Sequence, residues 1–224
     1  MDDPLLILDQ VVGCLDKWAL SVADISLASQ SENIVYRLTT TQGGNYALRI
    51  HRPGYHTFAE LVSEHEWTNA LIEAGFPLPN AIPTTDGELY VPANVDGGVR
   101  FAGLVEWLDG SSLQAMTAKD ENRELLYASL EQAGELMAKL HHHSRQWQPS
   151  ESFRRHKFDI DGFFGDAPFW GRYWDSSFVD EAQRQLLLKS QKQLTQTLGK
   201  LGNTPGVFGM IHADLHHGNL FLST

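Results

Sequence analysis

The 224-residue sequence is poor in cysteine, in positive charge and in long apolar runs. Its single cysteine, Cys14, excludes internal disulfides and is typical of a reducing compartment. No apolar run approaches the roughly 20 residues that span a bilayer, and the first residues are acidic, unlike those of a signal peptide. The net charge of −11 argues against a general nucleic-acid binder, which needs clustered cations. We therefore expect a cytoplasmic protein with no membrane and no nucleic-acid partner.

Apolar residues make up 42% of the chain and charged residues 20%, which is typical of a globular protein that needs no metal or disulfide to fold. Asp3 and Pro4 form a helix-start signal, with the aspartate as N-cap and the proline in the first turn. Helical spacing predicts that the inward face of this first helix is formed by Leu5, Leu8, Val12, Leu15 and Ala19.

The first half of the chain has the pattern of a mixed α/β region. Residues 34–40 are β-branched and aromatic, residues 42–45 form a turn signal, and residues 46–50 read as the returning strand of a hairpin. Residues 57–74 are predicted to form a helix that ends at Gly75, and short strands are expected at 89–91 and 99–107.

The second half is mainly helical by the same criteria. An apolar stripe predicts one helix from about Asp120 to His143 and another over residues 179–198. The intervening segment 153–178 is rich in aromatics and glycine, and we expect it to be irregular. A strand-rich half followed by a helical half predicts an α+β fold.

The most informative motif is His212-x-Asp214-x-x-x-x-Asn219, followed by the apolar residues 220–222. Asp214 and Asn219 are five positions apart in a loop that contains Gly218, so their side chains can converge on one point. A carboxylate can accept the proton of an attacking hydroxyl, and an amide oxygen is a hard ligand suited to Mg²⁺. This spacing indicates a phosphoryl-transfer loop, in which one side chain orients the nucleophile and the other holds the metal.

The motif resembles the catalytic loop of the aminoglycoside phosphotransferase and choline kinase-like superfamily, which includes homoserine kinase type II and stress-response kinase-like members. The resemblance implies a bilobal protein-kinase-like fold, with an antiparallel-sheet N-lobe over residues 1–105 and a hinge and mainly helical, incomplete C-lobe over 106–224. It implies ATP and Mg²⁺ as cofactors and a small-molecule hydroxyl, or a protein Ser or Thr, as acceptor. Asp214 would be the catalytic residue and Asn219 the metal ligand.

The same resemblance assigns a nucleotide site to the first half. Strand period places Ala47 and Arg49 on one face, so that Ala47 would lie under adenine while Arg49 reaches a phosphate. Most kinases have lysine in place of Arg49, and arginine keeps the charge with a fork suited to phosphate. Glu64, fifteen residues further on, would pair with Arg49, and Glu60 and Glu66 are alternatives for this role.

Residues 104–110 resemble the hinge between the lobes. Val105 would stand at the gatekeeper position, and the backbone at Glu106 and Leu108 would bind adenine. The loop that covers the phosphates would fall near residues 28–33, which lack the glycines that protein kinases have there.

One family feature has no counterpart in these residues: the second metal-binding aspartate, which follows the asparagine after a short hairpin. The resemblance therefore suggests a C-terminally truncated member with weak or no phosphotransfer on its own, and a non-catalytic, pseudokinase-like nucleotide-binding module is an alternative. A metal-dependent hydrolase is another alternative. Its ligands would be His212, Asp214, His216 and His217. The acceptor and the oligomeric state are left open by the sequence.

Overall fold

The structure, a computed structural model, describes residues 3–118 and 122–222. By its internal contacts the chain divides into two compact units. The first unit consists of Met1–Glu135, Gln148–Phe153 and Asp214–Thr224, and the second of Leu136–Trp147 and Arg154–Ala213. Within the described residues, no helix combines the length and the apolar character needed to cross a bilayer.

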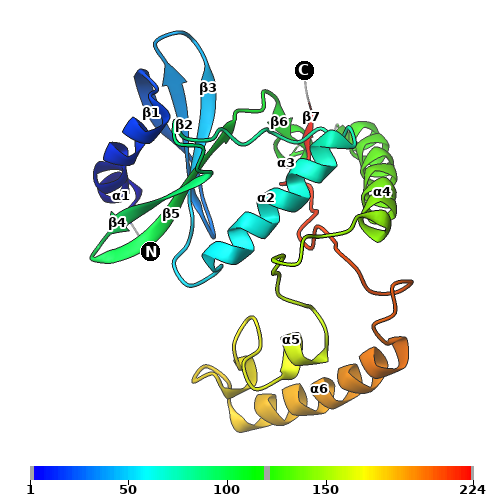
Figure 1. Cartoon of the computed structure of the whole chain (residues 1–224). Helices are drawn as coiled ribbons and strands as arrows, with labels where there is room; N and C mark the ends of the chain where they lie inside the picture. Colours follow the sequence, from blue (N-terminus) through cyan, green and yellow to red (C-terminus); the bar gives the residue numbers. More distant parts are fainter. Residues whose placement is uncertain (1–2, 119–121, 223–224) are drawn as a thin grey trace. The chain divides into compact units, whose positions relative to one another are not determined.

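Figure 1 shows the helices and strands along the chain, which include the predicted hairpin and the three long predicted helices. Up to the end of the sheet, the elements are α1 (Pro4–Val11), the 3₁₀ helix η1 (Val12–Trp18), β1 (Val22–Gln30), β2 (Ile34–Thr40), β3 (Asn45–Ile50), α2 (Phe58–Glu73), β4 (Tyr90–Val95) and β5 (Gly98–Glu106). They are followed by β6 (Ser111–Ser112), α3 (Leu113–Met116), α4 (Arg123–Gln146), α5 (Ile160–Phe164), the 3₁₀ helix η3 (Tyr173–Asp175), α6 (Glu181–Leu201) and β7 (Phe221–Leu222).

Five strands form one antiparallel sheet in the order β1-β2-β3-β5-β4. The predicted hairpin is confirmed as β2 and β3, which pair from Ile34 with Ile50 to Thr39 with Asn45. The sheet and the helices together confirm the α+β class. Strand β1 was not predicted, because most of its side chains are exposed and it joins the sheet through backbone pairing with β2.

The hydrophobic core of the first unit lies between one face of this sheet and the N-terminal helices α1 and η1. Alternate residues of β2 are buried, which is the period of a strand with one covered face. The indole N–H of Trp18 also donates to the carbonyl of Ile82 at 2.7 Å, so η1 is fixed by a polar contact as well as by burial. The fully enclosed side chains of this core are Ile7, Val11, Tyr36, Leu38, Leu48, Ile50, Ala102 and Leu104.

The prediction for the inward face of the first helix was wrong in part. Leu5 and Val12 are 70% and 44% exposed and Ala19 is also exposed, whereas Ile7 and Val11 are buried. Residues 5–12 carry apolar side chains on more than one side of the helix, so their spacing fits two faces equally well. From Val12 the chain continues as a 3₁₀ helix, whose tighter turn brings Leu15 and Trp18 inward; of the five predicted residues, Leu15 is buried and Leu8 partly so.

The three long predicted helices are present as α2, α4 and α6. The predicted start of α4 at about Asp120 lies outside the described residues, and α4 ends at Gln146 rather than His143. The segment 153–178, predicted to be irregular, contains the two short helices α5 and η3. The carboxylate of Asp159 accepts from the backbone N–H of Gly162 at 2.9 Å and caps α5, a local signal that the aromatic-rich composition obscured.

Candidate active site

The free face of the sheet carries the residues predicted to bind a nucleotide. In β3, Leu48 and Ile50 are fully buried toward the core, so Ala47 and Arg49 lie on the opposite face. Ala47 pairs directly with Val105 of β5, and side chains of directly paired residues in an antiparallel sheet are neighbours on one face. The side chains of Ala47 and Val105 thus form an apolar patch next to Arg49.

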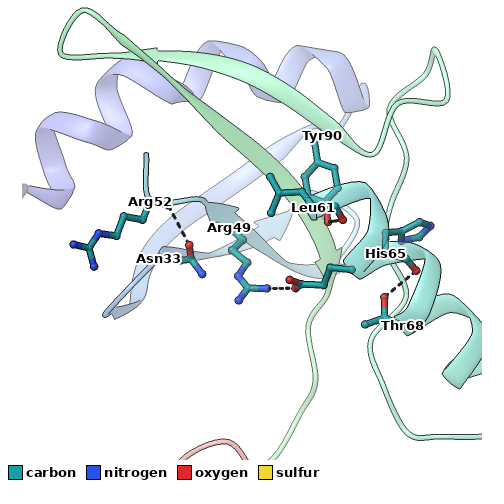
Figure 2. Close-up of polar contacts among 8 residues, drawn as sticks. Asn33, Arg49, Arg52, Leu61, His65, Thr68 and Tyr90 are labelled. Atoms are coloured by element: carbon teal, nitrogen blue, oxygen red, sulfur yellow. Dashed lines mark hydrogen bonds and ion pairs between the residues drawn. The ribbon is translucent and has the colours of Figure 1, made fainter. Parts of the chain in front are cut away.

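Arg49 and Glu64 form an ion pair between β3 and α2, with 3.5 Å between Nη1 and Oε1. In Figure 2, Arg49 reaches from the end of its strand toward the helix. The two side chains are 43% and 28% exposed, and an ion pair this open to solvent adds little to stability. Its main effect is to orient the guanidinium.

The two alternative glutamates of α2 have other partners. Glu60 and Thr57 form a capping box: the Glu60 carboxylate accepts from the Thr57 N–H at 2.8 Å, and the Glu60 N–H donates to the Thr57 hydroxyl at 3.3 Å. Glu66 accepts from the N–H and the hydroxyl of Ser150, both at 2.7 Å. Of the three candidates, Glu64 is therefore the one that the structure places against Arg49.

Tyr90 and Gly103 hold α2 beside the sheet, and neither role was predicted from the sequence. The Tyr90 hydroxyl donates to the carbonyl of Leu61, one turn before Glu64, at 3.3 Å. A Cβ on Gly103, the residue paired with Arg49, would lie 2.9 Å from two atoms of the Tyr90 ring. The glycine inside a strand was the available signal, because such a glycine often marks the close approach of another group.

His51 follows Arg49 at the end of β3 and is 6% exposed. Burial lowers the pKa of its imidazole to about 4, and the positive charge of Arg49 lowers it further in the same direction. The ring meets Tyr90 edge to face at 5.5 Å between centroids. His51 is therefore neutral near pH 7 and adds no second positive charge beside Arg49.

The predicted hinge, residues 104–110, connects β5 to the two-stranded sheet of β6 and β7. The Glu106 N–H donates to the carbonyl of Asn80 at 2.9 Å, and the Glu106 carboxylate accepts from the Asn80 side chain at 2.7 Å. The Leu108 N–H has no hydrogen-bond acceptor among the described residues. Between Glu106 and Leu108, the Trp107 ring contacts the guanidinium of Arg37, which lies 4.9 Å from the ring centroid. Arg37 belongs to β2, the strand that pairs with β3.

Asp214 and Asn219 converge, as their spacing predicts. The Asn219 amide nitrogen donates to the Asp214 carbonyl and to its carboxylate Oδ2, both at 2.9 Å. The backbone closes the loop from inside: the His216 N–H donates to the Asp214 carbonyl at 3.0 Å and the Asn219 N–H to the His216 carbonyl at 2.8 Å. The Asp214 side chain is 74% exposed, so a substrate can reach it.

The backbone around this loop has two uncommon features. Ala213, directly before Asp214, has a φ of +65°, a conformation that costs a non-glycine residue energy and is frequent at functional sites. A Cβ on Gly218 would lie 2.7 Å from His216 Cε1, so a side chain at this position would displace the His216 ring from the Gly218 N–H. The backbone conformation next to Asp214 and Asn219 thus helps to set where these two side chains lie.

The loop is anchored to the segment that follows the hinge. Ser111 of β6 pairs with Leu222 of β7, and the Leu113 N–H donates to the Leu220 carbonyl at 2.8 Å (Figure 1). The Gln114 N–H adds a bond to the His217 carbonyl at 3.0 Å. Hinge and loop are thus connected by a short, hydrogen-bonded stretch of chain.

The donor set of the loop suits a hard cation better than a transition metal. Asp214 and Asn219 offer carboxylate and amide oxygens, which Mg²⁺ and Ca²⁺ prefer. His216 accepts from the Gly218 N–H through Nδ1 at 3.0 Å, and its Nε2 lies 3.7 Å from Asp214 Oδ1. Within the described residues, the histidines of this loop and Asp214 do not gather into a group of three metal ligands, as the hydrolase alternative requires.

The segment 28–33, predicted to cover phosphates, forms the end of β1 and the turn into β2. The Ser31 N–H donates to the Asn33 carbonyl at 3.0 Å, and the Asn33 side chain accepts from the Arg52 N–H at 3.1 Å (Figure 2). Glu32 forms an ion pair with the Arg52 side chain, which offsets the negative charge of this turn.

The chain is similar to known proteins in sequence and in fold. The model of the phosphotransferase enzyme family (APH) matches residues 25–224. The amicoumacin kinase of Bacillus subtilis (strain 168) is 22% identical over 205 residues, which are 91% of this chain and 56% of that protein.

Two solved structures are similar to the fold. The microcompartment-associated aminopropanol kinase has a TM-score of 0.79 and 28% identity, over 95% of this chain and 63% of that one. Amicoumacin kinase hAmiN in complex with AMP-PNP, Ca²⁺ and Ami has a TM-score of 0.73 and 19% identity, over 99% of this chain and 60% of that one. The chain has the kinase-like fold of these proteins and spans less than two thirds of their length.

Proposed function

The chain belongs to the phosphotransferase enzyme family, and from this premise we propose that it binds ATP and a divalent cation for phosphate transfer to a hydroxyl group of a small molecule. The observation that carries the proposal is the ion pair between Arg49 and Glu64. It fixes a cation at the end of β3, on the face of the sheet that the core leaves open.

The nucleotide base would lie on the patch formed by Ala47 and Val105. Because the Glu106 N–H already donates to Asn80, the carbonyl of Glu106 is left as the acceptor for an adenine amino group, and the Leu108 N–H as the donor to a ring nitrogen. In this arrangement residues 1–105 form the nucleotide-binding lobe, and residues 106–224 contribute the hinge, helices and catalytic loop.

The phosphates would be held by Arg49, oriented by Glu64. Asn219 would hold Mg²⁺ through its amide oxygen, while its amide nitrogen donates to the Asp214 carboxylate at 2.9 Å. When bound, the metal neutralises charge on the phosphates. The structure of amicoumacin kinase hAmiN in complex with AMP-PNP and Ca²⁺ supports nucleotide and divalent-cation binding in this fold.

Asp214 would act on the acceptor. Its carboxylate orients the hydroxyl and accepts its proton as the oxygen bonds to the γ-phosphorus and the bond to ADP breaks. Positioning supplies most of the rate enhancement in such a reaction. The left-handed backbone conformation of Ala213 and the hydrogen bond from the Asn219 amide orient this carboxylate.

We propose an amino alcohol as the acceptor class. The support is the similarity to an aminopropanol kinase and the net charge of −11, which favours the approach of a cationic substrate. A panel of small alcohols with and without an amino group tests this class through ADP release. Equal turnover of matched neutral alcohols would contradict it.

Nucleotide binding is tested by calorimetry with AMP-PNP and with adenosine. Arg49→Ala should weaken AMP-PNP binding by about tenfold or more, because a charge-assisted contact to phosphate is lost, and leave adenosine binding unchanged. The matched control is Arg172→Ala, which removes the same charge from an exposed arginine paired with Asp175. Equal loss of both ligands in Arg49→Ala would mean that Arg49 does not contact phosphate.

The chemical step is tested under single-turnover conditions. Asp214→Asn should abolish phosphotransfer and keep AMP-PNP affinity within about twofold, because the carboxylate acts on the acceptor. No carboxylate follows Asp214 in the 224 residues. We therefore expect these residues alone to bind nucleotide with weak turnover, which keeps the non-catalytic module as the second candidate function; robust turnover by them would exclude it.

A further inference from the structure

A cavity of about 780 Å³ lies in the first unit, and none of the residues that line it is proposed to bind nucleotide or acceptor. It is formed by η1, the start of α2 and the strands β4 and β5. Its volume is in the range of sites that enclose a small molecule. The walls are lined by Gly13, Cys14, Asp16, Lys17, Phe58, Thr84, Asp86, Glu88, Tyr90, Val91, Pro92 and Phe101.

Hydrogen bonds fix the walls of this cavity relative to one another. The carbonyl of Lys17 accepts from the N–H of Thr85 at 2.9 Å and from its hydroxyl at 3.2 Å, which ties η1 to the turn before β4. Within that turn, the Thr84 N–H donates to the Glu88 carbonyl at 2.8 Å and the Glu88 N–H to the Thr84 hydroxyl at 2.9 Å. The cavity is thus a preformed site.

The floor of the cavity is aromatic. Phe58 contacts the rings of Phe101 at 5.1 Å and Tyr90 at 6.5 Å between centroids, yet its side chain is 44% exposed. An apolar ligand that covers the exposed part of this phenylalanine would gain hydrophobic free energy. The three rings offer faces and edges on which a flat or branched apolar group can pack.

The rim of the cavity is acidic. Asp16, Asp86 and Glu88 line it with Lys17 as the single cationic side chain, so the charges around the opening sum to −2 at neutral pH. An anionic ligand would be repelled and a cation attracted, and aromatic faces also favour a cation.

We propose that this cavity is a second ligand site, which takes an organic ammonium ion with an apolar body. The aromatic floor holds the body and the carboxylates of the rim hold the ammonium group. The site does not depend on the proposed function, because none of its lining residues is proposed to bind nucleotide or acceptor.

The first test uses tryptamine, with indole-3-propionate as an anion of the same ring system, on the full chain without nucleotide. We expect saturable binding of tryptamine by calorimetry or NMR titration, at least tenfold tighter than that of indole-3-propionate. Failure of tryptamine to bind, or equal binding of the two compounds, would overturn the proposal.

Gly13 offers a way to fill the cavity. No atom lies within 4 Å of a Cβ built on Gly13, and its φ is not in the left-handed region, so the backbone accepts a Cβ there and Gly13→Leu adds a side chain at the cavity wall. Gly134→Leu is the matched control, because Gly134 of α4 is equally open and does not line the cavity. We expect Gly13→Leu to weaken tryptamine binding by tenfold or more and Gly134→Leu to leave it unchanged; equal affinities would place the ligand elsewhere.

The charge of the rim is tested separately, in case Gly13→Leu disturbs η1. The double variant Asp86→Asn, Glu88→Gln keeps the shape of two exposed side chains and removes two negative charges. Tryptamine affinity should fall about fivefold in low salt, while AMP-PNP affinity should stay within twofold. An unchanged tryptamine affinity would remove the electrostatic basis of the site.

Discussion

Helices α2 and α6 begin in the same way and end in different environments. Each starts with a capping box, formed by Thr57 and Glu60 in α2 and by Asp180 and Gln183 in α6. Yet α2 buries four of its 16 residues, whereas none of the 21 residues of α6 is buried. Leu186, Leu194 and Leu201 of α6 are each at least 50% exposed.

The difference shows which part of a helix makes a site. Capping sets where a helix begins, and a buried face sets where its other side chains point. Because Leu61, Trp67 and Leu71 are buried, Glu64 meets Arg49 and Glu66 meets Ser150. Helix α6 has the same local start and no such fixed face among the described residues.

The largest expected effect comes from matched leucine truncations in the two helices. Leu61→Ala should lower the free energy of unfolding by about 3 kcal/mol, because it leaves a cavity at a fully buried position. Leu194→Ala, at a position 50% exposed, should change it by less than about 0.5 kcal/mol. Urea denaturation measures both, and similar losses would show that α6 has a packed face in solution.

The contact that holds α2 to the sheet is tested at glycines of β5. Gly103→Ala should cost about 2 kcal/mol of stability, because its Cβ would overlap the Tyr90 ring. Gly98→Ala is the control: its Cβ would meet only the Val95 carbonyl at 3.6 Å, an ordinary contact. If the two substitutions have the same effect in thermal or urea unfolding, Tyr90 does not need the space over Gly103.

The pH dependence of stability compares a buried histidine beside β3 with an exposed one in α4. Because burial lowers the pKa of His51 to about 4, the unfolded chain binds a proton at higher pH than the folded one. The neutral His51 therefore costs the folded protein no stability above about pH 6.5. As pH falls from there toward 4, the free energy of unfolding falls by about 1.4 kcal/mol per pH unit. His51→Gln should remove that slope from urea midpoints measured between pH 4 and 7. His142→Gln, at an exposed position of α4, should retain it, and an unchanged slope in His51→Gln would contradict the buried neutral state.

The smallest effect should be the same in both helices. Removal of an N-cap costs about 1 kcal/mol, which corresponds to about fivefold faster amide exchange in the first turn. We expect this in α2 for Thr57→Ala and in α6 for Asp180→Ala. Hydrogen exchange read at each helix start checks it. An effect confined to α2 would mean that the capping box of α6 does not form.

Much of the fold follows from local pattern. The hairpin of β2 and β3, the long helices and the convergence of Asp214 with Asn219 could be predicted, because period, turn signals and short spacing determine them. The side of α1 that packs on the sheet could not, because apolar residues occupy more than one of its sides. The roles of Glu66 and Gly103 also escaped prediction, since their partners Ser150 and Tyr90 are distant in sequence, and a glycine inside a strand signals a close approach without identifying the partner.

The pair of Arg49 and Glu64 is the product of the buried face of α2, and its coupling is the most direct test. A double-mutant cycle with Arg49→Ala, Glu64→Gln and both together should be measured as AMP-PNP affinity by calorimetry. We predict that Glu64→Gln weakens binding about fivefold when Arg49 is present and not at all when Arg49 is replaced, because Glu64 acts only by orienting the guanidinium. Equal effects of Glu64→Gln in both backgrounds would contradict the role of α2 in holding Arg49 for phosphate.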